Sequence, residues 1–132
     1  MSLGSVRRNL PRLPSHTESS EQITLFQWAV YNAKTMPELA LLHHVPNGGL
    51  RTKATAGRMR SEGVKAGVPD ICLPVPRGAY HGLYIELKRV GGAGPTKHQQ
   101  KWIDALARQG YKASVCFGWE SAAREIQAYI KQ

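Results

Sequence analysis

Two apolar segments that carry charged residues constrain this chain more than any other feature. Residues 68–75 (VPDICLPV) and 83–88 (LYIELK) are short and aliphatic, and the turn-rich stretch PRGAYHG separates them. This pattern predicts two strands joined as a hairpin. Asp70 lies in the first segment, and Glu86 and Lys88 lie in the second. Strands this apolar are expected in the core, so the three charges need a chemical explanation.

The spacing of these charges places them together on one side of the predicted sheet. Side chains alternate between the two faces of a strand, so the three aliphatic residues of the second segment share one face. Glu86 and Lys88 share the opposite face, about 6.5–7 Å apart along the strand. Asp70 comes to lie opposite Glu86 if the two segments pair as a hairpin. Two carboxylates and one ammonium then converge on a single face.

Two interpretations of this cluster are open. In the first, the face is a surface, and Glu86 and Lys88 form an exposed ion pair that contributes little to stability. In the second, the apolar neighbours make these strands central. Two converging carboxylates repel each other and are usually kept for a cation or for proton chemistry. Carboxylate and carbonyl oxygens are the ligands of hard divalent cations such as Mg²⁺.

The charge of the chain indicates a polyanionic partner. Eighteen Lys and Arg face nine Asp and Glu, which gives a net charge of +9 and a pI near 9.9. No segment has the amphipathic pattern of a membrane-surface helix, and no apolar run is long enough to span a membrane, so we expect nucleic acid and no membrane. A bound metal activates water for phosphodiester hydrolysis, and a nearby lysine stabilises the developing charge. The combination predicts a metal-dependent nuclease.

The 132 residues predict one domain, residues 19–132, after a flexible arm of residues 1–18. Ser19 and Gln22 fit a capping box at the start of a helix over 19–36, and its expected buried face is Ile23, Phe26, Ala29, Val30 and Ala33. Further strands are expected over 39–45 and 112–117, helices over 96–109 and 119–131, and a glycine-rich loop over 46–67. The order α-β-β-β-α-β-α predicts an α/β fold with a central mixed sheet flanked by helices.

The motifs also resemble a known family. GVPD (67–70) followed by IELK (85–88) resembles the PD-(D/E)XK nuclease signature. Together with HHVPNGG (43–49), GVKAGVPD (63–70) and HQQKWIDALARQGY (98–111), the ordered set resembles the VRR-NUC branch, the virus-type replication-repair nucleases. This resemblance implies a restriction-endonuclease-like core. It also implies that Mg²⁺ or Mn²⁺ is bound by Asp70, Glu86 and the Leu87 main-chain carbonyl, with Lys88 as the catalytic lysine.

Two more site residues follow from the resemblance, each with an alternative. Such nucleases often place a Glu on the first helix near the metal, and Glu21 matches by position; the alternative is an acid favoured by the helix dipole. The family also has a Gln at the start of the helix after the ExK motif, which corresponds to Gln99. The alternative for Gln99 is a capping box with Thr96.

The loop over 46–67 carries five glycines, five basic residues and one Glu. Its basic residues are candidate phosphate ligands, and the alternative is a solvated run of charge. They are Arg51, Lys53, Arg58, Arg60 and Lys65.

Other features bear on the compartment and the substrate. Cys72 and Cys116 are too few for a disulfide framework, so buried, reduced thiols in a cytoplasmic protein are expected. The family implies a bacterial or phage-infected cell. A single catalytic domain cuts one strand, so we expect a homodimer acting on branched DNA such as a four-way junction, with duplex DNA also a possible substrate. A non-catalytic nucleic-acid-binding module and an RNase stay open as alternatives.

Overall fold

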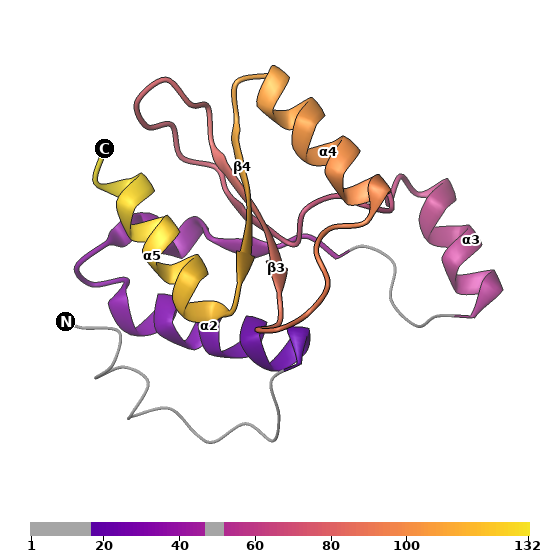
Figure 1. Cartoon of the computed structure of the whole chain (residues 1–132), viewed down its shortest axis with the longest axis horizontal. Helices are drawn as coiled ribbons and strands as arrows, with labels where there is room; N and C mark the ends of the chain where they lie inside the picture. The colour runs from indigo at the N-terminus through magenta and orange to yellow at the C-terminus, as the bar shows by residue number, and fades with distance from the viewer. Residues whose placement is uncertain (1–16, 47–51) are drawn as a thin grey trace.

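A four-stranded mixed sheet forms the centre of the molecule (Figure 1). The computed structural model describes residues 17–46 and 52–132. The strands lie in the order β1-β2-β3-β4; the first three are antiparallel, and β3 and β4 are parallel. Their bounds are β1 His43–His44, β2 Ile71–Leu73, β3 Leu83–Lys88 and β4 Lys112–Phe117. The mixed sheet confirms the predicted fold class.

Helices flank this sheet on both sides. The pair α2 and α5 packs together and against β3, and α4 packs against β4 and reaches the other face (Figure 1). None of the helices in residues 17–46 and 52–132 is long and apolar enough to cross a membrane. The helical elements are α2 Glu18–Asn32, the 3₁₀ helix η1 Pro37–Leu41, α3 Lys53–Ser61, α4 Lys97–Arg108 and α5 Trp119–Ile130.

The core lies between the sheet and the α2–α5 pair. Leu83, Ile85 and Leu87 of β3 are at most 2% exposed and belong to the same cluster as Trp28 and Ile126. Each such side chain stabilises the fold by roughly 1.5–3 kcal/mol. The aliphatic face of β3 therefore supplies stability, as its alternation predicted.

The first helix differs from its prediction in its start, its end and its buried face. Thr17, not Ser19, is the N-cap, and it forms a capping box with Ser20. Glu18, which was assigned to the arm, is therefore the first residue of the helix. The helix ends at Asn32. The predicted buried face is partly right: Ala29 is buried and Phe26 and Ala33 pack against the core, whereas Ile23 and Val30 are 47% and 79% exposed.

Ile23 and Val30 were predicted to be buried because α2 carries two apolar stripes. The stripe of Leu25, Trp28 and Ala29 is buried, whereas Ile23 and Val30 are exposed. Burying an indole removes far more apolar surface than burying a valine. The stripe that contains Trp28 therefore faces the core.

Two more segments differ from their predictions. The strand expected over 39–45 is shorter, because Pro37 begins the helical turn η1 that runs to Leu41, and only His43–His44 form β1. The loop expected over 46–67 contains α3, which Thr52 caps by accepting a hydrogen bond from the Thr55 N–H. The glycine content of this loop obscured a run of good helix formers (Lys, Ala, Arg and Met). The other strands and helices lie within three residues of their predicted bounds.

Candidate active site

The register of the hairpin brings the two predicted acids together. Ile71, the first residue of β2, pairs with Ile85 of β3. When this register is continued past the start of β2, Asp70 comes opposite Glu86 and, one step further, Pro69 comes opposite Leu87. Directly opposed side chains on one face are about 4.5–5.5 Å apart at their Cβ atoms. Asp70 is fixed further, because its Oδ2 accepts a hydrogen bond of 3.0 Å from the Leu87 N–H.

Glu86 is a carboxylic acid that is buried away from water. It is 2% exposed, and its Oε1 is buried with no hydrogen-bond partner in the described part of the chain. Burial first, and then the hydrogen bond and the negative charge of Asp70, raise the pKa of Glu86 to about 9, although Lys88 acts in the opposite direction. A buried oxygen without a partner is costly and calls for a donor or a cation.

The register of the hairpin also affects the Leu87 carbonyl. A residue whose N–H points toward the neighbouring strand also directs its carbonyl there. Leu87 donates its N–H toward Asp70, on the β2 side. The residue opposite Leu87 is Pro69, which has no N–H to donate. The ladder therefore supplies no donor from Pro69 to this carbonyl, which suits the predicted role as a ligand.

Lys88 is held at the end of β3 by two other elements. It is 7% exposed, and its Nζ donates a hydrogen bond of 3.0 Å to Gln99 Oε1 of α4. Glu18 Oε1 at the start of α2 lies 3.6 Å from the same Nζ. An ammonium that is buried and held by two oxygens has a defined position next to Glu86, which shares its face of the strand.

Gln99 fits both of its predicted interpretations at once. Its Oε1 accepts from the Thr96 N–H, and the Gln99 N–H donates to Thr96 Oγ1, so the capping box is present. The same Oε1 accepts from Lys88. The loop before Asp70 passes close to this helix at Gly67, which has a φ of 91°. A Cβ at this position would lie 3.0 Å from the His98 backbone, so there is no room for a side chain.

Glu21 has a different environment from the one expected. It is 3% exposed; its Oε1 accepts from the Trp119 N–H at 3.2 Å, and its Oε2 accepts from the Val90 N–H at 3.4 Å. These bonds tie α2 to the start of α5 and to the end of β3. The metal-ligand role of Glu21 stays a prediction, and the acid of α2 that contacts Lys88 is Glu18, which sequence reasoning missed. A helix N-terminal Glu carries no signal of which way it will point.

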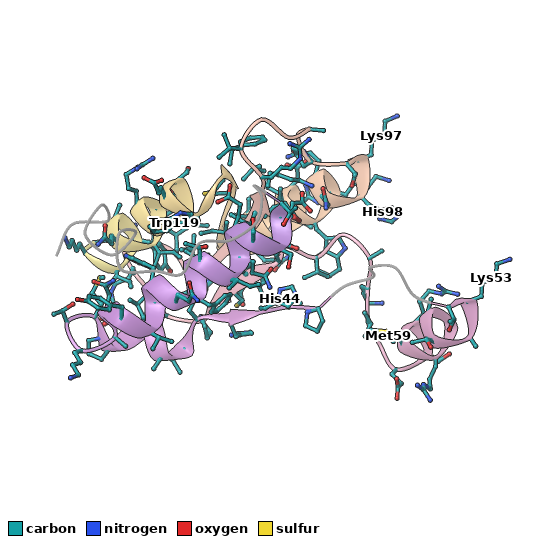
Figure 2. The ribbon with its side chains drawn as sticks, turned by 90° about the horizontal axis from the view of Figure 1, so that it is seen from below. His44, Lys53, Met59, Lys97, His98 and Trp119 are labelled. Carbon is teal, nitrogen blue, oxygen red and sulfur yellow. The ribbon has the colours of Figure 1, made fainter. Side chains whose placement is uncertain are left out.

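The basic residues predicted to bind phosphate lie on a separate element. Lys53, Arg58 and Arg60 are exposed on α3, and Lys65 is exposed on the following turn. No residue of α3 is buried, and Figure 2 shows the helix standing apart from the sheet, with Lys53 at its outer end. Arg51 lies outside the described residues. The arrangement is an exposed basic helix that stands apart from the sheet carrying Glu86.

The donor set fits a hard cation that is only partly coordinated by protein. Among the residues that the structure describes, no group of three or more His, Cys, Asp and Glu side chains could hold a metal ion. The oxygens predicted to bind a cation are those of the two neighbouring carboxylates, Asp70 and Glu86, and the Leu87 carbonyl. Mg²⁺ commonly binds one or two carboxylates and takes its remaining ligands from water and phosphate. The orphan Oε1 of Glu86 supports this fit.

Fold and site together define an α/β protein of the nuclease type, with an acid pair and a lysine at the two central strands of a mixed sheet. The VRR-NUC domain model matches residues 9–119, and the chain belongs to the VRR-NUC family of nuclease domains. It is similar to a solved structure named "VRR_NUC domain protein", with 35% identity and a TM-score of 0.76 over 90% of this chain and 92% of that chain. No curated protein matches the sequence.

Proposed function

We propose that the chain is a Mg²⁺- or Mn²⁺-dependent endonuclease that hydrolyses DNA phosphodiester bonds. The observation that carries this proposal is the buried Glu86, whose Oε1 has no partner in the described part of the chain and which lies opposite Asp70 and beside Lys88. Membership in a nuclease family supports it. The metal, when bound, lowers the pKa of a water and stabilises charge on the phosphate oxygens.

The residues of the chain have distinct roles in this proposal. Asp70, Glu86 and the Leu87 carbonyl hold the cation. Lys88 directs its ammonium at the negative charge that develops on the phosphate, and Gln99 keeps that ammonium in place through the 3.0 Å hydrogen bond. Burial of Glu86 and Lys88 on one face, and the hydrogen bond from the Leu87 N–H to Asp70, keep the geometry of the three groups fixed before substrate arrives.

Binding of the DNA backbone is assigned to α3. A nine-residue helix that buries nothing is marginal in water by itself. Contacts from its exposed Lys53, Arg58 and Arg60 to phosphates give it a partner and give the complex a strong salt dependence. The net charge of +9 favours the same partner.

The finer parts of the proposal are branched DNA as the preferred substrate and a homodimer as the working form. Each chain offers one acid pair and therefore cuts one strand at a time. A two-fold dimer presents two sites to two strands, which symmetric incision of a four-way junction requires.

A cleavage assay tests this proposal. Labelled linear, flapped and four-way DNA are incubated with the protein and Mg²⁺, Mn²⁺, Ca²⁺ or EDTA. We expect cleavage with Mg²⁺ and Mn²⁺, binding with little turnover with Ca²⁺, and none in EDTA. Glu86→Gln should lose more than about 100-fold in rate. Asp104→Asn, an exposed carboxylate on α4, is the control.

Three outcomes would contradict the proposal in whole or in part. Undiminished cleavage by Glu86→Gln would remove the acid pair from the reaction. Binding without any cleavage under every metal condition would favour the non-catalytic binding module instead. Cleavage of RNA but not of DNA would favour the RNase.

A further inference from the structure

A hollow of about 350 Å³ lies at the point where β3 and β4 end and α5 begins. The ends of these two strands lie side by side (Figure 1). Two exposed apolar side chains line the hollow, Val90 at 57% exposure and Phe117 at 43%. We call it the Phe117 hollow. The residues that define its chemistry are Phe117, Val90, Glu21, Glu120 and Arg124.

The strand register places Phe117 beside the acid site. Phe117 pairs with Lys88 in the parallel ladder, and the N–H of the next residue, Gly118, donates a 2.8 Å hydrogen bond to the Lys88 carbonyl. Paired residues of neighbouring strands share a face of the sheet, and the strands are about 4.8 Å apart. Phe117 therefore belongs to the face that carries Glu86 and Lys88, and its exposed ring lies one strand away from the lysine of the proposed reaction.

The walls of the Phe117 hollow are held in place by contacts between separate segments. Glu21 of α2 accepts hydrogen bonds from the Trp119 N–H at 3.2 Å and from the Val90 N–H at 3.4 Å. A Cβ at Gly118 would lie 2.7 Å from Val90 Cγ2, so the backbone after Phe117 and the Val90 side chain are closely packed. The hollow is therefore preformed, which lowers the entropic cost of binding a ligand there.

The chemistry of the lining selects the kind of ligand. Glu21 and Glu120 contribute two carboxylates, against the single cation of Arg124. Carboxylates repel a phosphate group, so this hollow is a poor site for the DNA backbone. A nucleobase is uncharged, has a π face that stacks on an aromatic ring, and has polar groups at its edge. Phe117 supplies the ring, and Arg124 and Glu120 supply a donor and an acceptor for the edge.

We propose that the Phe117 hollow binds an unpaired nucleobase of the DNA, stacked on the Phe117 ring. This inference rests on the proposed function and adds a substrate contact to it. One nucleotide advances about 3.4 Å along a strand of duplex DNA, so the bound base belongs to a nucleotide within about two of the phosphate at Lys88. Removal of a base from a paired stack costs free energy, least where the base is already unpaired. The contact therefore favours flapped and branched DNA over linear duplex.

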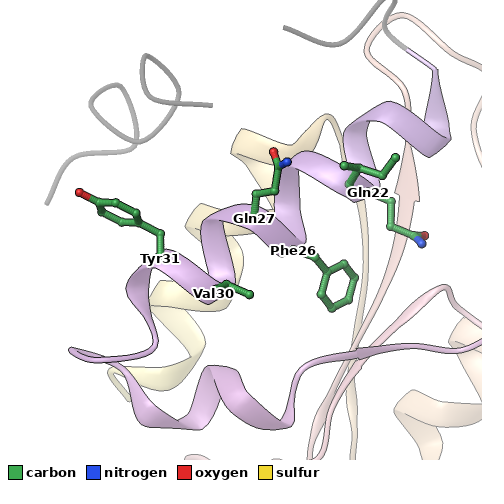
Figure 3. Close-up of a pocket in the computed structure, with 6 residues that line it drawn as sticks. Gln22, Phe26, Gln27, Val30 and Tyr31 are labelled. Atoms are coloured by element: carbon green, nitrogen blue, oxygen red, sulfur yellow. The ribbon is translucent and has the colours of Figure 1, made fainter. Parts of the chain in front are cut away.

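The first experiment measures binding of labelled flapped DNA to the full chain in Ca²⁺, which is expected to allow binding with little turnover. Phe117→Ala should weaken binding about 5–100-fold, and Phe117→Trp should bind at least as tightly as the wild type, because an indole also stacks. The salt slope of Phe117→Ala should equal that of the wild type, since no charge is removed. The control is Tyr31→Ala, which removes a ring of similar exposure (46%) that points outward from α2 (Figure 3).

A second experiment separates stacking from a general effect on the fold. An abasic site is placed at successive positions of the single-stranded arm of the flapped DNA. At one position the wild type should lose about 5–100-fold in affinity, whereas Phe117→Ala should lose less than about twofold there, because its stacking partner is already absent. A purely structural effect of Phe117→Ala would leave the loss at every abasic position the same as in the wild type.

Two results would overturn the proposal: unchanged binding by Phe117→Ala, or equal abasic losses in the wild type and Phe117→Ala at every position. Cleavage in Mg²⁺ distinguishes this inference from the proposed function. Coupling between Phe117 and one base without any cleavage would refute the nuclease and leave the base site standing. Cleavage by the wild type without such coupling would refute the base site alone.

Discussion

Removal of the negative charge at position 86 should stabilise the metal-free protein. Glu86 is 2% exposed and its Oε1 has no partner in the described residues, so its ionised form is poorly accommodated. Its pKa is raised from an ordinary value of 4.5 to about 9, mainly by burial and then by Asp70. Glu86→Gln keeps the shape of the side chain and removes the charge.

The sign of the pH dependence follows from the protons bound. Between about pH 5.5 and 8 the folded metal-free protein holds about one proton more than the unfolded chain, so stability falls as pH rises. A difference of one bound proton changes the free energy of unfolding by at most about 1.4 kcal/mol per pH unit. Asp70 is partly exposed, so solvent screening reduces this pH slope, and we expect about half of the limiting value. For a domain of this size, that is about 2–4 °C in Tm per pH unit.

Thermal unfolding in EDTA at pH 5 to 8 measures the effect. The Tm of Glu86→Gln should exceed that of the wild type by about 5–10 °C at pH 8 and converge with it near pH 5. Asp104→Asn corrects for the titration of other groups. Addition of Ca²⁺ at pH 8 should raise the Tm of the wild type and leave Glu86→Gln unchanged. Equal Tm values and equal pH slopes for Glu86→Gln and wild type would refute the reasoning.

Three other perturbations test separate parts of the site. Lys88→Met should lower the cleavage rate more than about 100-fold while DNA affinity changes less than about threefold, since the lysine acts on the transition state; an equal loss of both would make it a binding residue. Neutralising Lys53, Arg58 or Arg60 should reduce the log–log salt slope of DNA binding by about 0.9 for each phosphate that the variant no longer neutralises. An unchanged slope in all three variants would favour the alternative that α3 is a solvated run of charge. Glu21→Gln should destabilise the fold by about 1.5–3 kcal/mol in urea unfolding, because the buried N–H of Trp119 and the partly buried N–H of Val90 lose a charged acceptor. Unchanged stability with weakened metal binding would instead support its predicted role as a ligand.

The parts of the fold that the sequence predicted well are those in which local pattern and tertiary packing agree. β4 matches its prediction at both ends, and β3 presents its aliphatic residues to the core as its alternation indicated. The opposition of Asp70 and Glu86 could also be predicted, because the turn-rich linker after β2 left the hairpin as the simplest pairing.

The errors occurred where two local patterns competed. In α2, the exposed stripe of Ile23 and Val30 has the same period as the buried stripe, and the large apolar surface of Trp28 decides which stripe faces the core. The contrast between Glu18 and Glu21 was not predictable for a related reason. The two acids lie three residues apart on one helical turn, and which of them reaches Lys88 depends on where β3 and α5 end.

The central sheet separates stability from chemistry by its two faces, which explains how a small chain tolerates buried charges. On one face, Leu83, Ile85 and Leu87 bury apolar surface against α2 and α5 and stabilise the fold by several kcal/mol in total. On the other face of the same strand, Glu86 and Lys88 occupy positions where two more aliphatic residues would have increased stability. Because alternate residues face opposite ways, the aliphatic face offsets the cost of the charged face within a single six-residue strand. The rigidity of the apolar face then transmits directly to the positions of the acid and the lysine, so each substitution that loosens the core, such as Ile85→Ala, is expected to disturb the site as well as the fold.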